Sequence, residues 1–299
     1  EQVLSAIDKV IALDPVNIVF SGGEPMLRED LFYILEYTAQ MYKGKVTLST
    51  NGTLINEENV QKLVELCYQI DISVDGVDEE SCSIIRGPGV FGKVIESVKL
   101  LQKHGFKNID LSMTICEKTE HLEDEFNKLN ASLGTFPTIR VFSPIGRGST
   151  NDLKLMREKS KGTFIPKNFQ KVLSEKPMRA CACGAGYREL FISSNGSIYP
   201  CPILTEEEYK IGNIKDINDL RYLGSIDCSQ KKAYENLSNI EPDSFYKCKE
   251  CKVNMFCWTC LDELKRLKSH EIDFDKRCSM IKPILYDLVW GSLRRDVSV

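Results

Sequence analysis

Nine of the 12 cysteines lie between Cys181 and Cys278, and their spacing could do metal chemistry. The tightest part reads Cys248-Lys249-Glu250-Cys251, and after five residues Cys257-Trp258-Thr259-Cys260. A cysteine pair that encloses two residues can point both thiolates at one centre, while the intervening amides hydrogen-bond the sulfurs. The array therefore indicates a bound metal or an iron–sulfur cluster.

A second group of cysteines lies upstream of this array. Cys183 and Cys201 cannot close a four-thiolate site alone, so they need ligands from the later group. Seven or eight cysteines at these spacings suit two four-ligand sites. Disulfides would need an oxidising compartment, yet the chain shows neither a signal peptide nor the size of a small scaffold. Spacing alone does not separate structural zinc from iron–sulfur clusters.

The bulk composition limits the partners. A chain of 299 residues has room for one large domain and a small one. A net charge of -4 argues against a general nucleic-acid surface, and no apolar run approaches the ~20 residues of a membrane helix. We expect a cytoplasmic protein without nucleic-acid or membrane partners. Glu1 falls inside an amphipathic pattern, which predicts that an N-terminal piece is missing.

The first 142 residues alternate between helical and strand patterns. Expected strands are residues 16–20, 46–50, 70–74, 108–115 and 139–142, and apolar residues at helical spacing precede or separate them. This order predicts right-handed crossovers and a parallel sheet. Three strands alternate apolar and polar residues, which gives each a polar face. We therefore expect a curled sheet whose polar face lines a ligand-binding lumen, with a flat sheet wet on one face as the alternative.

Chemistry-bearing residues follow the ends of these strands. Ser21-Gly22-Gly23-Glu24-Pro25 follows the first strand, Asn51-Gly52-Thr53 the second and Asp75-Gly76 the third. In barrels of parallel strands, the loops after the carboxyl ends build the active site. Adjacent glycines expose backbone groups to a ligand, and Glu24 can accept a hydrogen bond from an amine.

These motifs resemble the radical S-adenosylmethionine (SAM) enzymes. The resemblance rests on Gly22-Gly23-Glu24-Pro25, Ser73-Val74-Asp75-Gly76, Arg86-Gly87 and Pro144-Ile145-Gly146-Arg147-Gly148. The later array resembles their SPASM extension, which carries two auxiliary iron–sulfur clusters. The implied fold is α/β: a partial (β/α)6 TIM-like barrel lacking its first strand over residues 1–150, a basic linker over 151–180, and a small cysteine-rich α+β extension over 181–299.

The resemblance implies SAM as a cofactor and assigns residues to it. In that family the Gly-Gly-Glu-Pro stretch binds the methionyl amine, and a serine at the position of Ser73 lies near the methionyl group. The cofactor-binding residues expected here are Gly22, Gly23, Glu24, Pro25, Ser49, Asn51, Ser73, Asp75 and Arg86.

The resemblance also assigns two auxiliary [4Fe-4S] clusters. The first would use Cys183, Cys201 and Cys260, and the second Cys248, Cys251, Cys257 and Cys278. Either Cys181 completes the first cluster, or its fourth iron is open to substrate. The chain departs from the family at two points. The cysteine triplet of the SAM-cleaving cluster is absent, so a third cluster is expected upstream of residue 1, the alternative being its natural loss. Cys257 and Cys260 enclose two residues where three are common.

The implied activity is reductive SAM cleavage to a 5′-deoxyadenosyl radical that abstracts a substrate hydrogen. Relatives with this extension mostly modify peptides or proteins, so we expect a thioether or carbon–carbon crosslink in a ribosomally made peptide, with flavodoxin or ferredoxin as electron donor. Sulfatase-maturing enzymes are the runner-up, but the Asp that serves them as base is Pro202 here. A zinc-bearing, non-catalytic scaffold that binds peptides is the alternative from another class.

The remaining cysteines have simpler expectations. Cys67 and Cys116 are expected in the core, Cys82 in a loop without a partner, and Cys228 as a free thiol within the array. Ser194-Asn195-Gly196 between two short apolar runs predicts a hairpin that returns Cys201 toward Cys183. A closing helix is expected after Cys278.

Overall fold

The structure is a computed structural model that describes residues 2–116, 119–143, 183–223, 228–257, 260–268 and 270–291. The chain divides into two compact units, which are described separately below. The first consists of residues 1–142 with 219–221, and the second of residues 143–218 and 222–299. The predicted linker over 151–180, the Pro144–Gly148 motif and Cys181 lie outside the described residues.

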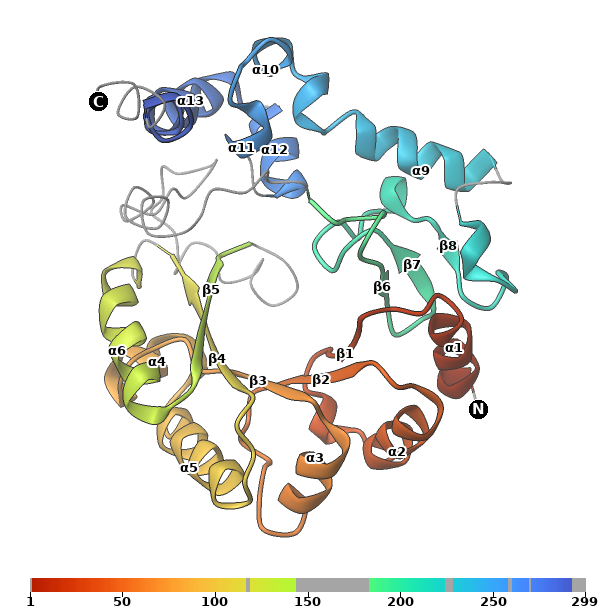
Figure 1. Cartoon of the computed structure of the whole chain (residues 1–299), viewed down its shortest axis with the longest axis vertical. Coiled ribbons are helices and arrows are strands. Elements are labelled where there is room, and N and C mark those ends of the chain that lie inside the picture. Colours follow the sequence, from red (N-terminus) through yellow and green to blue (C-terminus); the bar gives the residue numbers. More distant parts are fainter. Residues whose placement is uncertain are drawn as a thin grey trace, which may run out of the picture. The chain divides into compact units, whose positions relative to one another are not determined.

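The first unit is built on a five-stranded parallel sheet in the order β1-β2-β3-β4-β5 (Figure 1). The strands are β1 (Asn17–Phe20), β2 (Lys45–Thr50), β3 (Gln69–Ser73), β4 (Ile109–Ile115) and β5 (Phe136–Val141). The helices are α1 (Gln2–Ile11), α2 (Leu31–Met41), α3 (Val60–Leu66), α4 (Glu79–Arg86), α5 (Val90–Lys103) and α6 (Glu123–Leu133), with short 3-10 turns at Pro25–Leu27 and Glu120–Leu122. The predicted parallel α/β sheet and a partial, unclosed barrel are confirmed.

The two faces of this sheet differ as the alternation predicted. Leu48, Ile70, Ile72, Ile109 and Leu111 are fully buried on one face, where helices such as α2, α3 and α5 lie (Figure 1). The opposite face carries polar side chains, and several are also buried: Thr47, Asp71 and Ser112. Burial of a polar group costs free energy unless it is hydrogen-bonded, so this face must supply partners.

One helix was missed by the sequence reading. α4 follows β3 directly and begins with a capping box, in which Asp78 Oδ1 accepts from Ser81 N at 2.8 Å. The prediction that Cys82 lies in a loop without a partner is wrong. Cys82 lies on α4, is fully buried, and its thiol donates to the Val74 carbonyl oxygen at 2.8 Å. The Asp78-x-x-Ser81 spacing and Gly87 at the helix end were the available signals.

Gly76 allows α4 to pack this closely. A Cβ at Gly76 would lie 2.4 Å from the Cys82 backbone nitrogen, so any side chain there would push the helix away. Cys67 and Cys116 are buried, as predicted for core thiols. Burial raises the pKa of the Cys67 thiol to about 12.

The second unit is a small α+β fold, again as predicted. Its antiparallel sheet has the order β6-β7-β8, formed by β6 (Phe191–Ile192), β7 (Ser197–Tyr199) and β8 (Gly212–Asn213). Its helices are α9 (Cys228–Ser238), α10 (Tyr246–Lys249), α11 (Asn254–Cys257), α12 (Leu261–Lys268) and α13 (Glu271–Tyr286), with a π-helical end at Asp287–Gly291 and 3-10 turns at Glu207–Tyr209 and Pro242–Ser244; the 3-10 turn Leu220–Tyr222 is shared between the units. Cys278 lies inside α13, not ahead of a closing helix as expected.

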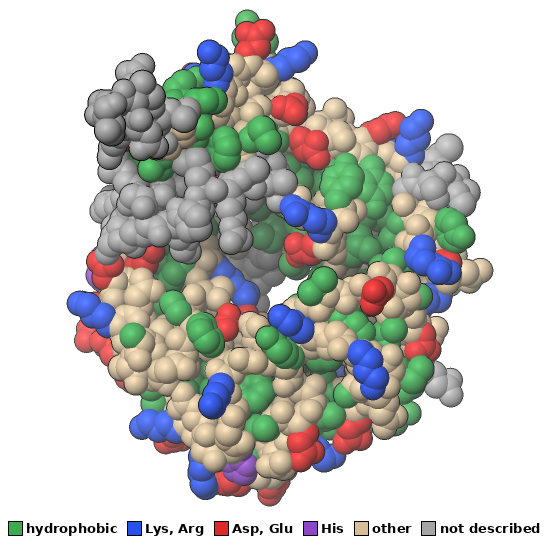
Figure 2. All heavy atoms as spheres, in the orientation of Figure 1, with side chains coloured by type: hydrophobic (Ala, Val, Ile, Leu, Met, Phe, Trp, Pro, Cys, Tyr) green, Lys and Arg blue, Asp and Glu red, His purple; other side chains and the backbone are tan. Residues whose placement is uncertain are grey.

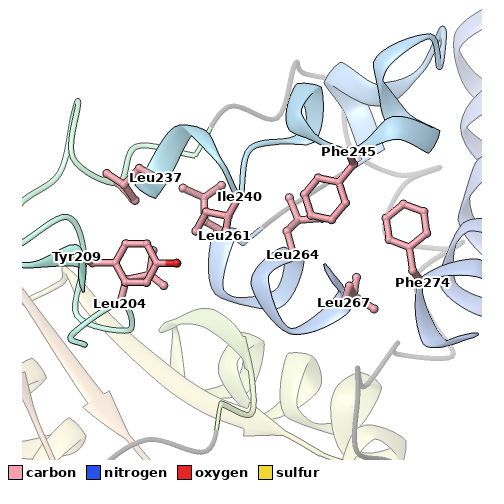
Figure 3. Close-up of a cluster of buried hydrophobic side chains, with 10 residues drawn as sticks. Leu204, Tyr209, Leu237, Ile240, Phe245, Leu261, Leu264, Leu267 and Phe274 are labelled. Atoms are coloured by element: carbon pink, nitrogen blue, oxygen red, sulfur yellow. The ribbon is translucent and has the colours of Figure 1, made fainter. Parts of the chain in front are cut away.

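A single apolar cluster holds much of this unit together (Figure 3). It contains Leu204, Tyr209, Leu237, Ile240, Phe245, Leu261, Leu264, Leu267 and Phe274. Phe245 and Phe274 stack with ring centroids 5.7 Å apart. The cluster draws side chains from loops and from short helices, so it fixes segments that have little regular structure of their own.

The surface shows acidic and basic side chains interspersed over the visible face (Figure 2). No described helix combines the length and the apolar character needed to cross a bilayer.

Candidate cofactor and cluster sites

Glu24 is held by three hydrogen bonds at the carboxyl edge of the parallel sheet. Its Oε1 accepts from Thr50 Oγ1 at 2.6 Å and from Met26 N at 3.1 Å, and its Oε2 accepts from Asn51 N at 2.7 Å. The carboxylate therefore caps the turn Pro25–Leu27 and ties the loop after β1 to the end of β2. A carboxylate has about four acceptor positions, and three are used by the chain. One remains on Oε2 for a ligand.

The glycine pair before Glu24 is open to solvent. A Cβ at Gly22 or at Gly23 would meet no atom of the described residues within 4 Å, so packing against this part of the chain does not demand glycine at either position. Gly22 has a φ of +155°, which side-chain-bearing residues rarely adopt. The space beside these two residues suits the close approach of a ligand to the backbone.

Asp75 and Arg86 form an ion pair at the same edge, in which the carboxylate is buried and the arginine partly exposed. Asp75 is 4% exposed, and its Oδ2 accepts from Arg86 Nε at 2.8 Å and pairs with Nη2 at 2.7 Å. Its Oδ1 accepts from Thr114 N at 2.5 Å, so Asp75 joins β3, α4 and β4. Asp75 follows the end of β3 and has a φ of +53°, a left-handed conformation that residues with a side chain rarely adopt. Arg86 uses two of its five donors in this pair.

Serine hydroxyls line the polar face below this edge. Ser73 is the register partner of Ser112, and their Oγ atoms lie 3.3 Å apart. Ser49 is the register partner of Asp71, and Asn51 follows β2 with its Oδ1 accepting from Thr53 N at 2.8 Å. The predicted residues thus occupy one face and one edge of the sheet.

Two carboxylates and a guanidinium that the predicted site does not include share this face. Asp71 pairs with Arg140 Nη2 across β4 through its Oδ2, while its buried Oδ1 has no hydrogen-bond partner among the described residues. Asp110, beside Asp71 in register, accepts from Thr138 Oγ1 at 3.1 Å. Burial raises the pKa of Asp110, and the hydrogen bond from Thr138 opposes that rise. An unsatisfied buried oxygen costs free energy, so it marks a place for a polar ligand or water.

In the second unit, Cys248 lies in a group of four cysteines. The pKa of the Cys248 thiol is raised to about 11, mainly by burial and to a lesser extent by the nearby Cys257, Cys278 and Cys251. Burial also raises the pKa of Cys257, and the charge of Arg277 opposes that rise. These thiols come from α10, α11, α13 and the turn after α10.

Three other cysteines group around Cys260. Burial raises the pKa of Cys201 to about 11, backbone amides of Leu204 and Ile203 oppose it, and Cys260 adds to it. Burial likewise raises the pKa of Cys260, with Cys183 adding to it. The predicted hairpin is present, and Gly186 N donates to Pro200 O at 3.0 Å, which joins the segments that carry Cys183 and Cys201.

The ten cysteines whose side chains the structure describes are free thiols. No group of three or more His, Cys, Asp or Glu side chains among the described residues is arranged to hold a single metal ion. Pro202, next to Cys201, is exposed.

Two family models match the chain. Residues 1–129 match the Radical SAM superfamily, and residues 181–252 match SPASM, an iron–sulfur cluster-binding domain. The chain therefore contains a radical SAM domain and a SPASM domain.

Similar proteins agree with this assignment. The chain is 26% identical over 232 residues to the mycofactocin maturase MftC of Mycolicibacterium smegmatis, covering 72% of this chain and 59% of MftC. It is 27% identical over 250 residues to the AdoMet-dependent heme synthase of Methanosarcina barkeri, covering 70% of this chain and 68% of the synthase. It therefore spans less than two thirds of the length of MftC. The solved structure of anSMEcpe with bound AdoMet and Cp18Cys peptide superposes with a TM-score of 0.64 at 19% identity, covering 95% of this chain and 91% of that one.

The family implies SAM and [4Fe-4S] clusters as cofactors, and the residues of this radical SAM chain fit both. For SAM, the fit is the remaining acceptor position on Glu24, the open space beside Gly22, and the unsatisfied oxygen of Asp71 on the polar face. For the clusters, it is seven thiols in two groups, with backbone and guanidinium N–H groups aimed at the sulfurs: Leu204 N lies 3.4 Å from Cys201 Sγ. Hydrogen bonds to the sulfurs are a regular feature of iron–sulfur sites.

Sequence reasoning missed three residues that shape these sites. Thr50 holds Glu24, Arg140 pairs with Asp71, and Arg277 contacts Cys257. Thr50 and Arg140 lie far in sequence from their partners, and Arg277 lies in a helix that no motif marks. The one usable signal was that Arg277 directly precedes Cys278.

Proposed function

We propose that the radical SAM chain is the catalytic part of an enzyme that modifies a peptide or protein, forming a thioether or carbon–carbon crosslink. The observation that carries the proposal is the combination in one chain of a polar, ligand-ready sheet edge with two groups of thiols in an iron–sulfur domain. When bound, SAM and its cluster supply a radical that removes a hydrogen atom from the substrate.

The residues at the sheet edge would bind and orient SAM. Glu24 offers its remaining acceptor position to the methionyl amine, and Gly22 and Gly23 let that amine approach the backbone. Arg86, which pairs with Asp75, would bind the carboxylate of SAM through the donors that Asp75 does not use. Pro25, Ser49, Asn51 and Ser73 complete the proposed set.

The thiols would hold two auxiliary clusters. We assign Cys183, Cys201 and Cys260 to the first, and Cys248, Cys251, Cys257 and Cys278 to the second. Cys181 lies outside the described residues, so whether it completes the first cluster stays a prediction, as does the cysteine triplet expected upstream of residue 1. An electron donor such as flavodoxin or ferredoxin belongs to the same proposal.

A peptide substrate is supported by the similarity to a maturase and to a solved structure that contains a peptide. The similarity to a heme synthase leaves a second substrate class to exclude. Pro202 cannot take a proton, which disfavours the sulfatase-maturing chemistry that uses an Asp at that place.

The test has two stages, both with the full-length protein under anaerobic conditions. Iron, sulfide and zinc are measured first. About eight irons on the seven assigned thiols and Cys181, beyond any held upstream, support the clusters, whereas about two zincs support a scaffold. The protein is then incubated with SAM, a reductant and a precursor peptide encoded beside its gene. A mass loss of two hydrogens supports crosslinking; an unchanged peptide under conditions that consume SAM contradicts it.

A further inference from the structure

Arg277 is a buried cation beside the second group of thiols. It lies on α13 immediately before Cys278, and it is 6% exposed. Its Nη2 donates to the Cys257 carbonyl oxygen at 3.0 Å, and its Nη1 lies 3.6 Å from Cys257 Sγ. Its Nε donates to Glu263 Oε1 on α12 at 3.0 Å.

A purely structural function does not explain every one of these contacts. The hydrogen bonds to the Cys257 carbonyl and to Glu263 join α11, α12 and α13. These bonds alone would account for a buried arginine at this position. The Nη1 contact is different, because a neutral thiol is a weak acceptor and gains little from a guanidinium. A thiolate bonded to a cluster is a strong partner for it. The Nη1 contact is therefore strongly stabilising only when Cys257 is a thiolate.

We infer that Arg277 is a positioning residue that sets the reduction potential of the second auxiliary cluster, through its charge and its N–H···S bond to Cys257. The inference rests on the proposed assignment of Cys248, Cys251, Cys257 and Cys278 to that cluster. One-electron reduction adds one negative charge to the cluster and breaks no bond. A buried positive charge beside a ligand sulfur stabilises the reduced form, so it raises the potential.

Glu263 supplies the opposite sign. Its side chain is 18% exposed and pairs with Arg277, so its negative charge offsets part of the effect of the guanidinium. The two residues therefore predict shifts in opposite directions when each is neutralised. A loss of packing would instead lower cluster content or broaden the signals in both variants.

Lys247 provides a matched control. It also precedes a proposed ligand of the same cluster, Cys248, but its side chain is 40% exposed and is paired with Asp275 at 2.7 Å and Glu271 at 2.9 Å. Solvent and the two carboxylates screen its charge. Lys247→Gln should therefore change the reduction equilibrium less than threefold.

The experiment is a redox titration with dithionite, followed by electron paramagnetic resonance, on full-length anaerobic protein. The signal of the second cluster is assigned by its loss in Cys251→Ala. We expect Arg277→Gln to lower the reduction equilibrium constant at least tenfold, which is a shift of about 59 mV to more negative potential. Arg277→Lys, which keeps the charge, should shift it less, and Glu263→Gln should shift it to more positive potential.

The outcomes separate the inference from the assignment beneath it. If wild-type protein has no signal that Cys251→Ala removes, the ligand assignment fails. If that signal is present at full iron content and both Arg277→Gln and Glu263→Gln leave its potential unchanged, or shift it in the same direction, the inference fails. If Arg277→Gln loses iron, the sign of the shift in Glu263→Gln decides, because that variant keeps the guanidinium.

Discussion

The candidate site of the first unit is held by polar groups that bond one another, whereas the candidate ligands of the second unit are thiols packed against an apolar cluster. Glu24 and Asp75 each receive three hydrogen-bonding contacts from the chain itself. Cys183, Cys201, Cys248 and Cys278 instead lie against the cluster of Figure 3, and burial raises the pKa of Cys201 and Cys248 to about 11. Hydrogen bonds within the chain therefore hold the first site together, whereas the buried thiols of the second unit stay protonated near neutral pH unless a bound metal or cluster stabilises the thiolates.

Cluster removal is the strongest test of this comparison. Chelation of iron from the full-length protein should expose residues 183–291 to hydrogen exchange, because the thiols lose the bonds that join their segments. Residues 2–143 should keep their protection, apart from segments that touch a cluster. Equal loss of protection in both regions would show that the first unit also depends on the clusters.

Asp75→Ala tests the opposite side of the comparison. It leaves Arg86 without its buried carboxylate and Thr114 N without an acceptor, so we expect a loss of about 2–3 kcal/mol of unfolding free energy. Chemical denaturation measures it. Asp30→Ala is the control, since Asp30 forms an exposed pair with Arg28 and its removal should cause no measurable change.

Glu24 separates stability from cofactor binding. Glu24→Ala leaves the Thr50 hydroxyl and two backbone amides without an acceptor, which should cost about 1–2 kcal/mol. Glu24→Gln keeps one oxygen and should lose less stability, but SAM affinity should fall at least tenfold in both, measured by equilibrium dialysis. Glu58→Gln, an exposed change, is the control. Unchanged SAM affinity in Glu24→Gln would remove Glu24 from the proposed cofactor site.

Asp110→Asn is expected to change the free energy of unfolding only slightly, by an amount that depends on pH. Burial raises the pKa of Asp110 in the folded state, so the folded protein binds this proton more tightly than the unfolded chain. The contribution of Asp110 to the free energy of unfolding is fully present below its pKa in the unfolded chain, near 3.8. It is lost as the pH rises through the higher pKa of the folded protein. Asp110→Asn should therefore be slightly more stable than wild type at neutral pH, with the advantage vanishing in acid. Denaturation at several pH values measures it.

The sequence predicted those features of the fold whose signal lies within a few neighbouring residues. Alternating residues such as Ile70, Asp71 and Ile72 predicted the strand and its two faces, because strand periodicity is local. α4 was missed because its eight residues carry few apolar positions, although the Asp78–Ser81 capping box was readable. The grouping of Cys183 with Cys260 came from the family resemblance, not from spacing.

Other features could not be predicted from the sequence. The pairs Glu24–Thr50, Asp75–Arg86 and Asp71–Arg140 depend on strand register and on where a helix begins. A polar residue in sequence indicates only that a partner is needed, and the fold decides which one.

The order of strands β1 to β5 has a consequence for how the protein is made. Among the described residues, each strand of this sheet pairs with the strands next to it in the chain, so the sheet can grow while the ribosome is still extending the polypeptide. The two proposed clusters would not form in this way, since the ligand set proposed for the first includes Cys183 and Cys260, and that for the second includes Cys248 and Cys278. Iron–sulfur assembly factors would therefore meet a chain whose first unit has already folded and whose second unit is still open.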